Sequence, residues 1–323
     1  MFVKERKSPL KLLQTEALLN RLKPIDHPKR SLIEQDLKKR KAGYQGEKTV
    51  DFHLSFLSDK QYLIFNDLRL PIAPTSFQMD SVLVTPYYIL PIEIKNISGT
   101  LTIDPEFNQL TKEFNGAETG YPDPIAQATR QKLFLQKWFH NNKLLCPPVE
   151  FLVVFSNPST ILRMSPGQKR ISPYDRMIHA QNIVREISKF NTLYTREVVN
   201  LKKIKRLFLN QHRVNYSSIL PTYQLTESDL IKGVLCEICR EIMVRKTRIW
   251  FCPHCLHLSK TAHLQAIEDY FLLIKPTITN GELRKFLQLF STRTATLILQ
   301  SLNLQKTGNT KGTLYMKNRK NRN

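Results

Sequence analysis

Long apolar runs are missing from this chain of 323 residues. No stretch of eighteen consecutive apolar residues occurs, so we expect no membrane-spanning helix. The first seven residues, Met1 to Lys7, lack the apolar centre of a signal peptide, so we expect a cytoplasmic protein. A bacterial source is a further expectation. No repeat at a fixed period is present, and cysteine is scarce, with five residues in all. These absences leave an intracellular globular protein as the expected class.

Acidic residues are too few to balance the basic ones. The chain has 27 Asp and Glu against 49 Lys and Arg, which gives a formal net charge of +22. Residues 1–41 carry 12 basic and 5 acidic residues, residues 42–199 carry 16 and 15, and residues 200–323 carry 21 and 7. Lys and Arg gain affinity for phosphates by releasing counterions, so a nucleic acid is the expected partner. Together with the motifs below, we expect DNA more than RNA. A solubilising surface and attraction to anionic lipid are the alternatives.

Apolar periodicity predicts an α/β core in which helices and strands alternate. We expect strands near residues 62–68, 79–84, 88–95 and 150–156, and a helix from Pro124 to about His140. Gly43 to Gly46 should interrupt the helical pattern, residues 99–104 should continue the sheet, and residues 105–123 should be irregular. The expected domains are a basic helical segment 1–41, the core 42–165, a basic helical connector 166–221, a cysteine module 222–260, a helical module 261–316 and a basic tail 317–323.

Two carboxylates and a lysine fall on neighbouring apolar strands of this core. Asp80 lies on one strand, and Glu93 and Lys95 lie on the next, after a turn of hairpin length. Because side chains alternate along a strand, Glu93 and Lys95 share one face. Buried charges are costly unless they are paired or bind a metal, and two carboxylates can hold Mg²⁺ or Mn²⁺. The pattern suits phosphodiester hydrolysis, while a structural ion pair is the simpler alternative.

These residues resemble a known family. Gly46-Glu47, Gln78-x-Asp80, Ile92-Glu93-Ile94-Lys95-Asn96 and Pro124-x-x-Gln127 look like the nuclease-related (NERD) domain, which is assigned to the PD-(D/E)xK restriction-endonuclease-like superfamily. The resemblance covers roughly residues 40–160. It implies a restriction-endonuclease-like core, with a mixed sheet flanked by helices, and a metal-dependent nuclease activity.

The resemblance also implies a role for each matching residue. Asp80 and Glu93 would be the Mg²⁺ ligands, and Lys95 would position the attacking water and stabilise charge on the phosphate. Glu47 would complete the acidic site from a helix, and Gln127 would orient a phosphate or a catalytic residue. Glu47 could instead be an ordinary acid in a first helical turn, and Gln127 a plain surface amide.

Four of the five cysteines have the spacing of a metal site. Cys236-x-x-Cys239 and Cys252-x-x-Cys255 are separated by twelve residues, which predicts a tetrahedral structural Zn²⁺ site in a zinc ribbon. Disulfides and an iron–sulfur cluster are the alternatives. Arg245, Lys246 and Arg248 would form a basic strip on the ribbon that binds nucleic acid. Cys146 stands alone and is expected to be a buried apolar residue.

The last part of the chain predicts three helices and a hairpin. Helices are expected over residues 262–274, 279–287 and 292–302, followed by strands near 304–307 and 313–316. This order resembles a winged helix, in which Arg293 would lead the recognition helix and Lys306 and Lys311 would contact phosphates. A small helical bundle packed on the zinc ribbon is the alternative.

The sequence therefore predicts a nuclease that cuts nucleic acid at a Mg²⁺ site and binds it through its zinc ribbon and basic C-terminal module. A non-catalytic nucleic-acid-binding protein that keeps a nuclease-like fold as its scaffold is the main alternative. A zinc-dependent regulator that binds a specific operator is a third.

Overall fold

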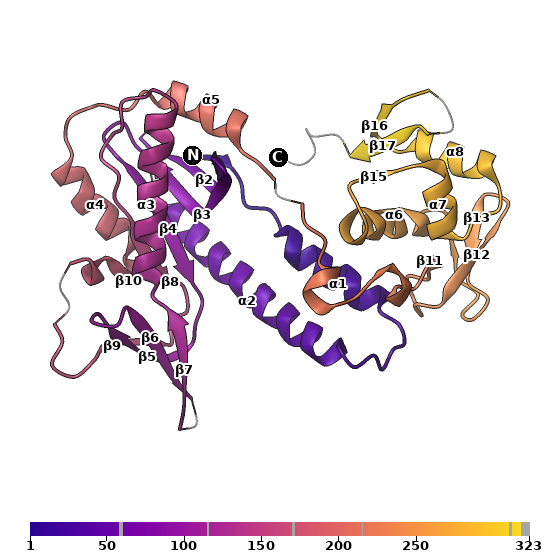
Figure 1. The fold of residues 1–323 in the computed structure, drawn as a ribbon, viewed down its shortest axis with the longest axis horizontal. Helices are drawn as coiled ribbons and strands as arrows, with labels where there is room; N and C mark the ends of the chain where they lie inside the picture. Colours follow the sequence, from indigo (N-terminus) through magenta and orange to yellow (C-terminus); the bar gives the residue numbers. More distant parts are fainter. Residues whose placement is uncertain (58–60, 115, 170–171, 215, 310–311, 318–323) are drawn as a thin grey trace. The chain divides into compact units, whose positions relative to one another are not determined.

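The computed structural model describes residues 1–57, 61–114, 116–169, 172–214, 216–309 and 312–317. The chain forms two compact units (Figure 1). Unit 1 consists of Met1–Lys7 and Ala42–Asn215, and unit 2 consists of Ser8–Lys41 and Tyr216–Asn323. The division differs from the expected domains because residues 166–214 pack within unit 1 and residues 8–41 pack within unit 2. Residues 318–323 of the expected basic tail lie outside the described residues.

The centre of unit 1 is a six-stranded sheet in the order β1-β2-β3-β4-β8-β10. Its strands are β1 (Phe2–Lys4), β2 (Leu63–Ile72), β3 (Thr75–Val84), β4 (Ile89–Lys95), β8 (Leu152–Phe155) and β10 (Met177–His179). The β2–β3 and β3–β4 pairs are antiparallel, whereas β1–β2, β4–β8 and β8–β10 are parallel. The mixed sheet confirms the predicted fold class, and the β3–β4 pair confirms the predicted hairpin.

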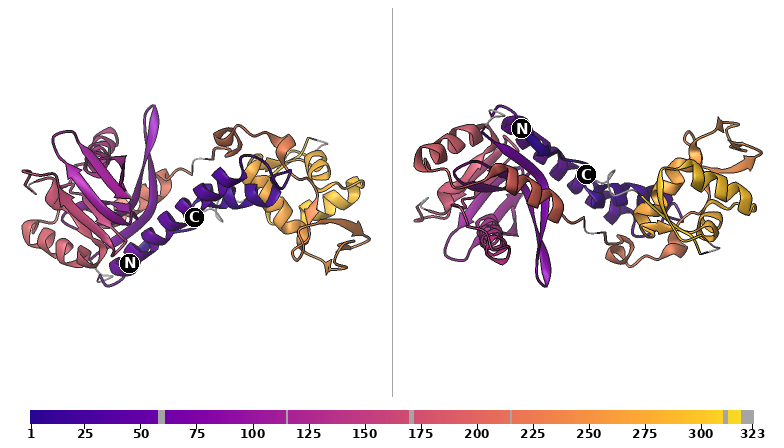
Figure 2. Two further views of the ribbon diagram at one scale, coloured as in Figure 1. Left: turned by 90° about the horizontal axis from the view of Figure 1, so that it is seen from below. Right: turned by 90° about the horizontal axis from the view of Figure 1, so that it is seen from above.

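Helices cover both faces of this sheet (Figure 2). The helices with residues in unit 1 are α2 (Arg30–Leu54), α3 (Pro124–Asn141), α4 (Ile183–Leu193) and α5 (Leu201–Gln211), with short 3₁₀ helices η1 (Tyr174–Arg176) and η2 (Ala180–Asn182). α2 and α4 pack on one face through Val50 and Ile187, and α3 and α5 pack on the other through Trp138 and Phe208. Within the described residues, no helix combines the length and the apolar character that crossing a membrane requires.

The expected interruption at Gly43 to Gly46 is wrong, because α2 runs through both glycines. A glycine in a helix interior costs about 1 kcal/mol relative to alanine. Burial of Val50 and Leu54 in the core of unit 1 offsets that cost. Tertiary packing therefore keeps this segment helical although its glycines disfavour a helix.

A second, four-stranded sheet in unit 1 has the order β7-β6-β5-β9. Its strands are β5 (Gly99–Asp104), β6 (Gln109–Phe114), β7 (Ala117–Pro122) and β9 (Thr160–Met164). The β6–β7 hairpin extends away from the six-stranded sheet (Figure 1). Two expectations are corrected: residues 99–104 do not continue the main sheet, and much of 105–123 is strand. Exposed polar side chains along β7 concealed the strand pattern in the sequence.

Unit 2 combines a small sheet with a helical module around one shared core. Its elements are α1 (Leu10–Arg21), the start of α2, η3 (Leu220–Tyr223), η4 (Glu227–Asp229), β11 (Val234–Leu235), β12 (Ile242–Lys246), β13 (Ile249–Phe251), β14 (Leu258–Ser259), α6 (Ala262–Leu273), β15 (Thr277–Ile278), α7 (Asn280–Leu287), α8 (Thr292–Ser301), β16 (Leu304–Thr307) and β17 (Leu314–Lys317). The predicted three helices and hairpin are present, and β15 joins the hairpin in the order β15-β17-β16. Trp250 of β13 and Tyr270 of α6 lie in the same core. The cysteine module and the helical module are thus packed together.

Candidate active site

Asp80 lies at a point where the β3–β4 ladder ends. The paired residues run from Val84 and Ile89 to Ser81 and Ile92, and the pairing stops there. Beyond this point, Oδ2 of Asp80 accepts a hydrogen bond of 2.9 Å from the main-chain N–H of Ile94. The carboxylate thus satisfies a donor of β4 and is held against that strand.

Glu93 and Lys95 share a face of β4, as the alternation of side chains predicts. Nζ of Lys95 donates to Oε1 of Glu93 at 2.7 Å and to Oε1 of Gln127 at 2.9 Å. The side chain of Glu93 is only 2% exposed. Gln131 donates from Nε2 to the other carboxylate oxygen of Glu93 at 2.7 Å. Two glutamines one helical turn apart on α3 therefore orient the charged pair.

Gln131 was not expected from the sequence. Its spacing of four residues after Gln127 puts both amides on one face of α3, and this periodicity was the available signal. The amide oxygen of the half-buried Gln127 and Nε2 of the buried Gln131 both find partners on β4, whereas Oε1 of Gln131 is buried without a hydrogen-bond partner among the described residues.

Glu47 enters the same region from α2 because the residue before it is a glycine. A Cβ atom at Gly46 would lie 2.4 Å from Oγ of Ser156 and 2.6 Å from Cβ of Asn96. Such contacts are too short for any other residue, so the glycine permits α2 to approach the ends of β4 and β8 closely. That approach fixes where Glu47 lies relative to the sheet.

Arg6, a residue that the sequence did not single out, lies among the acidic side chains. Its guanidinium donates to Glu47 at 2.8 Å, to both carboxylate oxygens of Asp51 at 2.8 and 3.1 Å, and to Asp67 at 3.4 Å. The Arg6 side chain is 2% exposed. A single arginine in a basic N-terminal segment carries no pattern that would have identified it.

Burial and repulsion by neighbouring carboxylates raise the pKa values of Asp80, Glu47 and Asp67. Burial, with the charges of Glu93 and Glu47, raises the pKa of Asp80 well above its usual range. Burial also raises the pKa of Glu47 to about 7, although the charge of Arg6 opposes the rise. The pKa of Asp67 is raised mainly by burial as well. Clusters of perturbed carboxyl groups beside a lysine are typical of catalytic and metal-binding sites.

The donor set fits a hard divalent cation. Asp80, Glu93 and Glu47 offer carboxylate oxygens, the ligands that Mg²⁺ prefers, and a bound cation would relieve their mutual repulsion. Within the described residues, their oxygens do not form a group of three within 4.8 Å of one another. Mg²⁺ usually keeps several water ligands and needs only one or two carboxylates, so this spacing agrees with its chemistry.

The four cysteines of unit 2 do form a compact group. Their sulfur atoms all lie within 4.8 Å of one another, with Cys236 and Cys255 at 3.5 Å and Cys239 and Cys252 at 3.4 Å. All four are free thiols, and tetrahedral Zn–S bonds of about 2.3 Å would place sulfurs about 3.8 Å apart. The arrangement fits a zinc ribbon. Cys146 is exposed in the segment between α3 and β8, so its expected burial is wrong.

The expected basic strip is not continuous. Arg245 packs over the ring of Trp250 and Lys246 over the ring of Phe251, because successive residues of β12 point to opposite faces. Nε and Nη1 of Arg245 are buried without a hydrogen-bond partner among the described residues. Arg248, in the turn between β12 and β13, is exposed, as are Arg293 at the start of α8 and Lys306 on β16. Lys311 lies outside the described residues.

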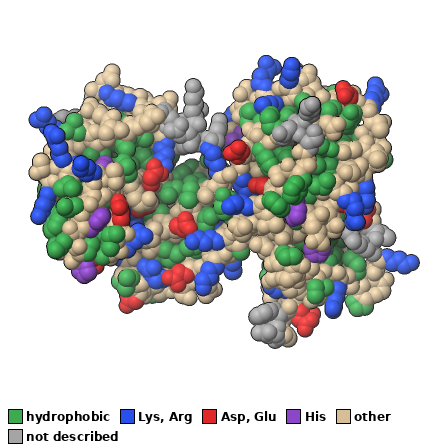
Figure 3. Space-filling view, turned by 180° about the vertical axis from the view of Figure 1, so that it is seen from behind, with side chains coloured by type: hydrophobic (Ala, Val, Ile, Leu, Met, Phe, Trp, Pro, Cys, Tyr) green, Lys and Arg blue, Asp and Glu red, His purple; other side chains and the backbone are tan. Residues whose placement is uncertain are grey.

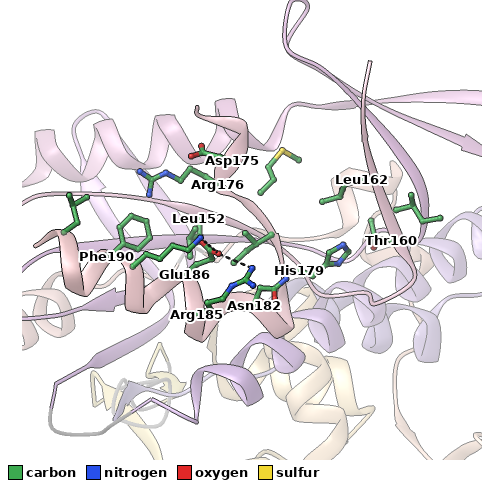
Figure 4. A pocket seen from close by; sticks show the side chains of 15 residues that line it. Leu152, Thr160, Leu162, Asp175, Arg176, His179, Asn182, Arg185, Glu186 and Phe190 are labelled. Atoms are coloured by element: carbon green, nitrogen blue, oxygen red, sulfur yellow. Dashed lines mark hydrogen bonds and ion pairs between the residues drawn. The ribbon is translucent and has the colours of Figure 1, made fainter. Parts of the chain in front are cut away.

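A hollow of about 820 Å³ lies beside the edge strand β10, between β9 and α4 (Figure 4). His179 lines it, and the register places His179 beside Phe155 and Phe155 beside Lys95, which puts His179 about 10 Å from Lys95 across the sheet. Glu186 in this hollow pairs with Lys189 at 2.9 Å and with Arg185 at 3.5 Å. Glu186 is thus paired with basic neighbours, and we take the carboxylates around Asp80 as the candidate chemical centre.

Of the comparisons with known proteins, one found a match. No curated protein and no solved structure gave a significant match. A family model described as "Nuclease-related domain" (NERD) matches residues 42–156. The matched segment contains Glu47, Asp80, Glu93, Lys95 and Gln127, whereas Arg6 lies outside it. Residues 42–156 of this chain therefore carry a nuclease-related domain, which has the restriction-endonuclease-like fold.

Proposed function

We propose that this protein is a divalent-metal-dependent nuclease that cuts DNA. The proposal depends mainly on one observation: Glu93 and Lys95 are held by Gln127 and Gln131 beside Asp80, on a sheet of the nuclease-related domain. A nearly buried carboxylate with a fixed orientation adds nothing to solubility, and such groups are common in catalytic and metal-binding sites.

Asp80 and Glu93 would hold Mg²⁺ or Mn²⁺ in this proposal. When bound, the ion would stabilise negative charge on the phosphate and lower the pKa of a coordinated water. Glu93 keeps lone pairs available beyond the two hydrogen bonds that it accepts. Glu47, whose pKa is raised to about 7, would contact the metal or a water ligand from α2.

Lys95 would orient the attacking water and stabilise the negative charge that develops on the phosphate. Its ammonium has three donors, and Glu93 and Gln127 use two of them. The third can reach a water or a phosphate oxygen. Gln127 would hold the lysine in place, which is one of the two roles, orienting a phosphate or a catalytic residue, that the family resemblance implies.

Unit 2 would bind the nucleic acid and contain a structural Zn²⁺ at Cys236, Cys239, Cys252 and Cys255. Lys and Arg side chains stand at several places over both units on the face shown in Figure 3. Arg245, Lys246, Arg248, Arg293 and Lys306 are our candidates for phosphate contacts, and Lys311 is a further candidate from the sequence. Such contacts would make binding strongly dependent on salt.

One observation favours the alternative of a non-catalytic, nucleic-acid-binding scaffold. Lys95 and Gln131 together engage both carboxylate oxygens of Glu93, as they would in a purely structural ion pair. A cleavage assay separates the two functions. We would incubate single-stranded DNA, duplex DNA and RNA with the protein in Mg²⁺ or Mn²⁺, and compare the wild type with Asp80→Asn.

The control for that assay is Asp104→Asn, since Asp104 is a carboxylate of unit 1 that caps a turn after β5 through the N–H groups of Glu106 and Phe107. We expect the wild type and the control to cut the substrate and Asp80→Asn to have lost this activity. Tight binding with no cutting of any of the substrates would support the scaffold instead.

A further inference from the structure

The residue at the centre of the acidic cluster in unit 1 is an arginine. Arg6 follows β1, outside residues 42–156, yet its guanidinium donates to three carboxylates, those of Glu47, Asp51 and Asp67. The contact with Asp51 is bidentate, which is the strong geometry for a guanidinium and a carboxylate. The three acids remain 17–23% exposed, whereas the Arg6 side chain is 2% exposed. The cation is therefore enclosed by its ligands.

Arg6 also reaches the strand that carries Asp80. Nη2 donates to the main-chain oxygen of Asp80 at 3.1 Å and to Oγ of Ser81 at 2.8 Å. In the β2–β3 ladder, Asn66 pairs with Ser81 and Leu68 pairs with Met79. Asp67 and Asp80, which lie between these pairs, are not paired with each other. Asp67 has a positive φ of 50° there, which is uncommon for a residue other than glycine. The guanidinium fills the interruption of the ladder and fixes the backbone of Asp80.

Three carboxylates around one position are the kind of site that hard divalent cations occupy in proteins. Here the position is filled by a guanidinium, which is always charged and cannot leave without breaking its hydrogen bonds. A divalent cation in the same position, in contact with the guanidinium, would be repelled by its charge. The position enclosed by Glu47, Asp51 and Asp67 is thus closed to a metal ion, whereas the guanidinium does not contact the carboxylates of Asp80 and Glu93 and uses one oxygen of Glu47.

We propose that Arg6 is a built-in cation of the nuclease site, and that it replaces one divalent ion so that the site binds a single ion at Asp80 and Glu93. This inference rests on the proposed function. Arg6 acts as a positioning residue through Glu47 and the backbone of Asp80. The N-terminal segment is then part of the active centre, although it lies outside the segment that matches the nuclease-related domain.

The test counts bound Mn²⁺ on the full chain, with Zn²⁺ added beforehand so that the cysteine group is occupied. Free Mn²⁺ is measured by electron paramagnetic resonance during titration. We expect one Mn²⁺ per chain for the wild type and two for Arg6→Gln, because the acids lose their internal cation. The double variant Arg6→Gln with Asp51→Asn should return toward one, since the vacated position then has one carboxylate fewer.

Arg69→Gln is the matched control. Arg69 lies on β2 of the same unit and donates to Ser76 and Gln78, so its removal takes away one positive charge without touching the acidic cluster. This variant should bind one Mn²⁺. Two ions in the control as well as in Arg6→Gln would overturn the inference, because a general change of charge would then explain the result.

Other outcomes are equally decisive. Two ions in the wild type, or one in Arg6→Gln, would refute the role of Arg6 and leave the proposed nuclease site intact. No ion in the wild type would refute the metal site itself. If Arg6→Gln fails to fold without metal, Mn²⁺ should restore its thermal unfolding transition, since an ion that binds only the folded state stabilises it. Absence of that rescue would contradict the inference.

Discussion

The amide of Gln127 accepts a hydrogen bond of 2.9 Å from Nζ of Lys95, which joins α3 to the last residue of β4. The same face of α3 carries Gln131, which holds Glu93. One helix therefore positions both members of the ion pair. The arrangement explains why a helix that starts at Pro124 belongs to the site although it follows β4 by some thirty residues.

We predict that Gly46→Ala lowers the stability of unit 1. The new methyl group would meet Ser156 and Asn96 at 2.4 and 2.6 Å, and overpacking of this kind costs about 1–3 kcal/mol. If α2 moves to relieve these clashes, Glu47 will be displaced and the affinity of the proposed site for metal will fall. Chemical denaturation and Mn²⁺ titration measure the two effects.

Gly43→Ala provides the matched control, because a Cβ there meets nothing within 4 Å and lies in the same helix. It should raise stability by up to about 1 kcal/mol through helix propensity alone. Equal effects of the two substitutions would show that close packing at Gly46 is unimportant.

The stability of unit 1 should fall in acid because of His212. Burial and the charge of Lys4 lower the pKa of His212 to about 4, and its Nδ1 accepts the N–H of Arg69. The unfolded chain, with a pKa near 6.5, binds more protons between pH 4 and 6.5, so the free energy of unfolding decreases as the pH falls through that range. The loss should be on the order of 1–3 kcal/mol.

His212→Gln keeps a side chain that can accept the N–H of Arg69 but does not titrate. Denaturation midpoints at pH 4.5 and 7 should differ less for this variant than for the wild type. An unchanged pH dependence would mean that other groups are responsible.

Removal of zinc should destabilise all of unit 2 beyond η4 and leave unit 1 folded. The ribbon and the helices share a core in which Cys236, Trp250, Tyr270 and Leu299 are buried. Hydrogen exchange after chelation should therefore rise in β11 to β14 and also in α6 to α8. Exchange that rises only within the cysteine module would show that the helices do not depend on it, and exchange that rises in β2 to β4 would contradict independent units.

The buried pair of Arg21 and Asp269 should be essential to unit 2. Nε of Arg21 lies 2.6 Å from Oδ2 of Asp269, and their side chains are 1% and 3% exposed. Arg21→Met would leave the carboxylate uncompensated and cost about 3–5 kcal/mol, whereas combining it with Asp269→Leu should recover most of that loss. Urea denaturation of both variants checks this, and a double variant no more stable than Arg21→Met would refute it.

The sequence was sufficient for the parts of the site that follow local rules. Side-chain alternation places Glu93 and Lys95 together, and the hairpin brings Asp80 beside them, so this part needed only the strand pattern. The Cys-x-x-Cys spacing likewise identified the cysteine group. Each of these inferences depends on residues that are close in the chain or related by a fixed motif.

The rest of the site depends on contacts between distant residues. Arg6 meets Glu47 and Asp80 only after the N-terminal strand pairs with β2, and no local pattern records that pairing. The passage of α2 through Gly43 and Gly46 similarly depends on burial against the sheet. The second sheet was missed because its edge strand β7 is mostly exposed and lacks apolar alternation.

The most direct test of the central claim is the single-turnover cleavage rate of Lys95→Met in Mg²⁺, measured with binding on the same DNA. Lys137→Met is the control, since Lys137 is an exposed lysine on α3 that the proposed site does not use. The account predicts that Lys95→Met binds DNA normally but cuts at least about 100-fold more slowly, as expected for a residue that acts in the transition state, while the control cuts normally. Equal cutting by Lys95→Met and the wild type would contradict the proposed site.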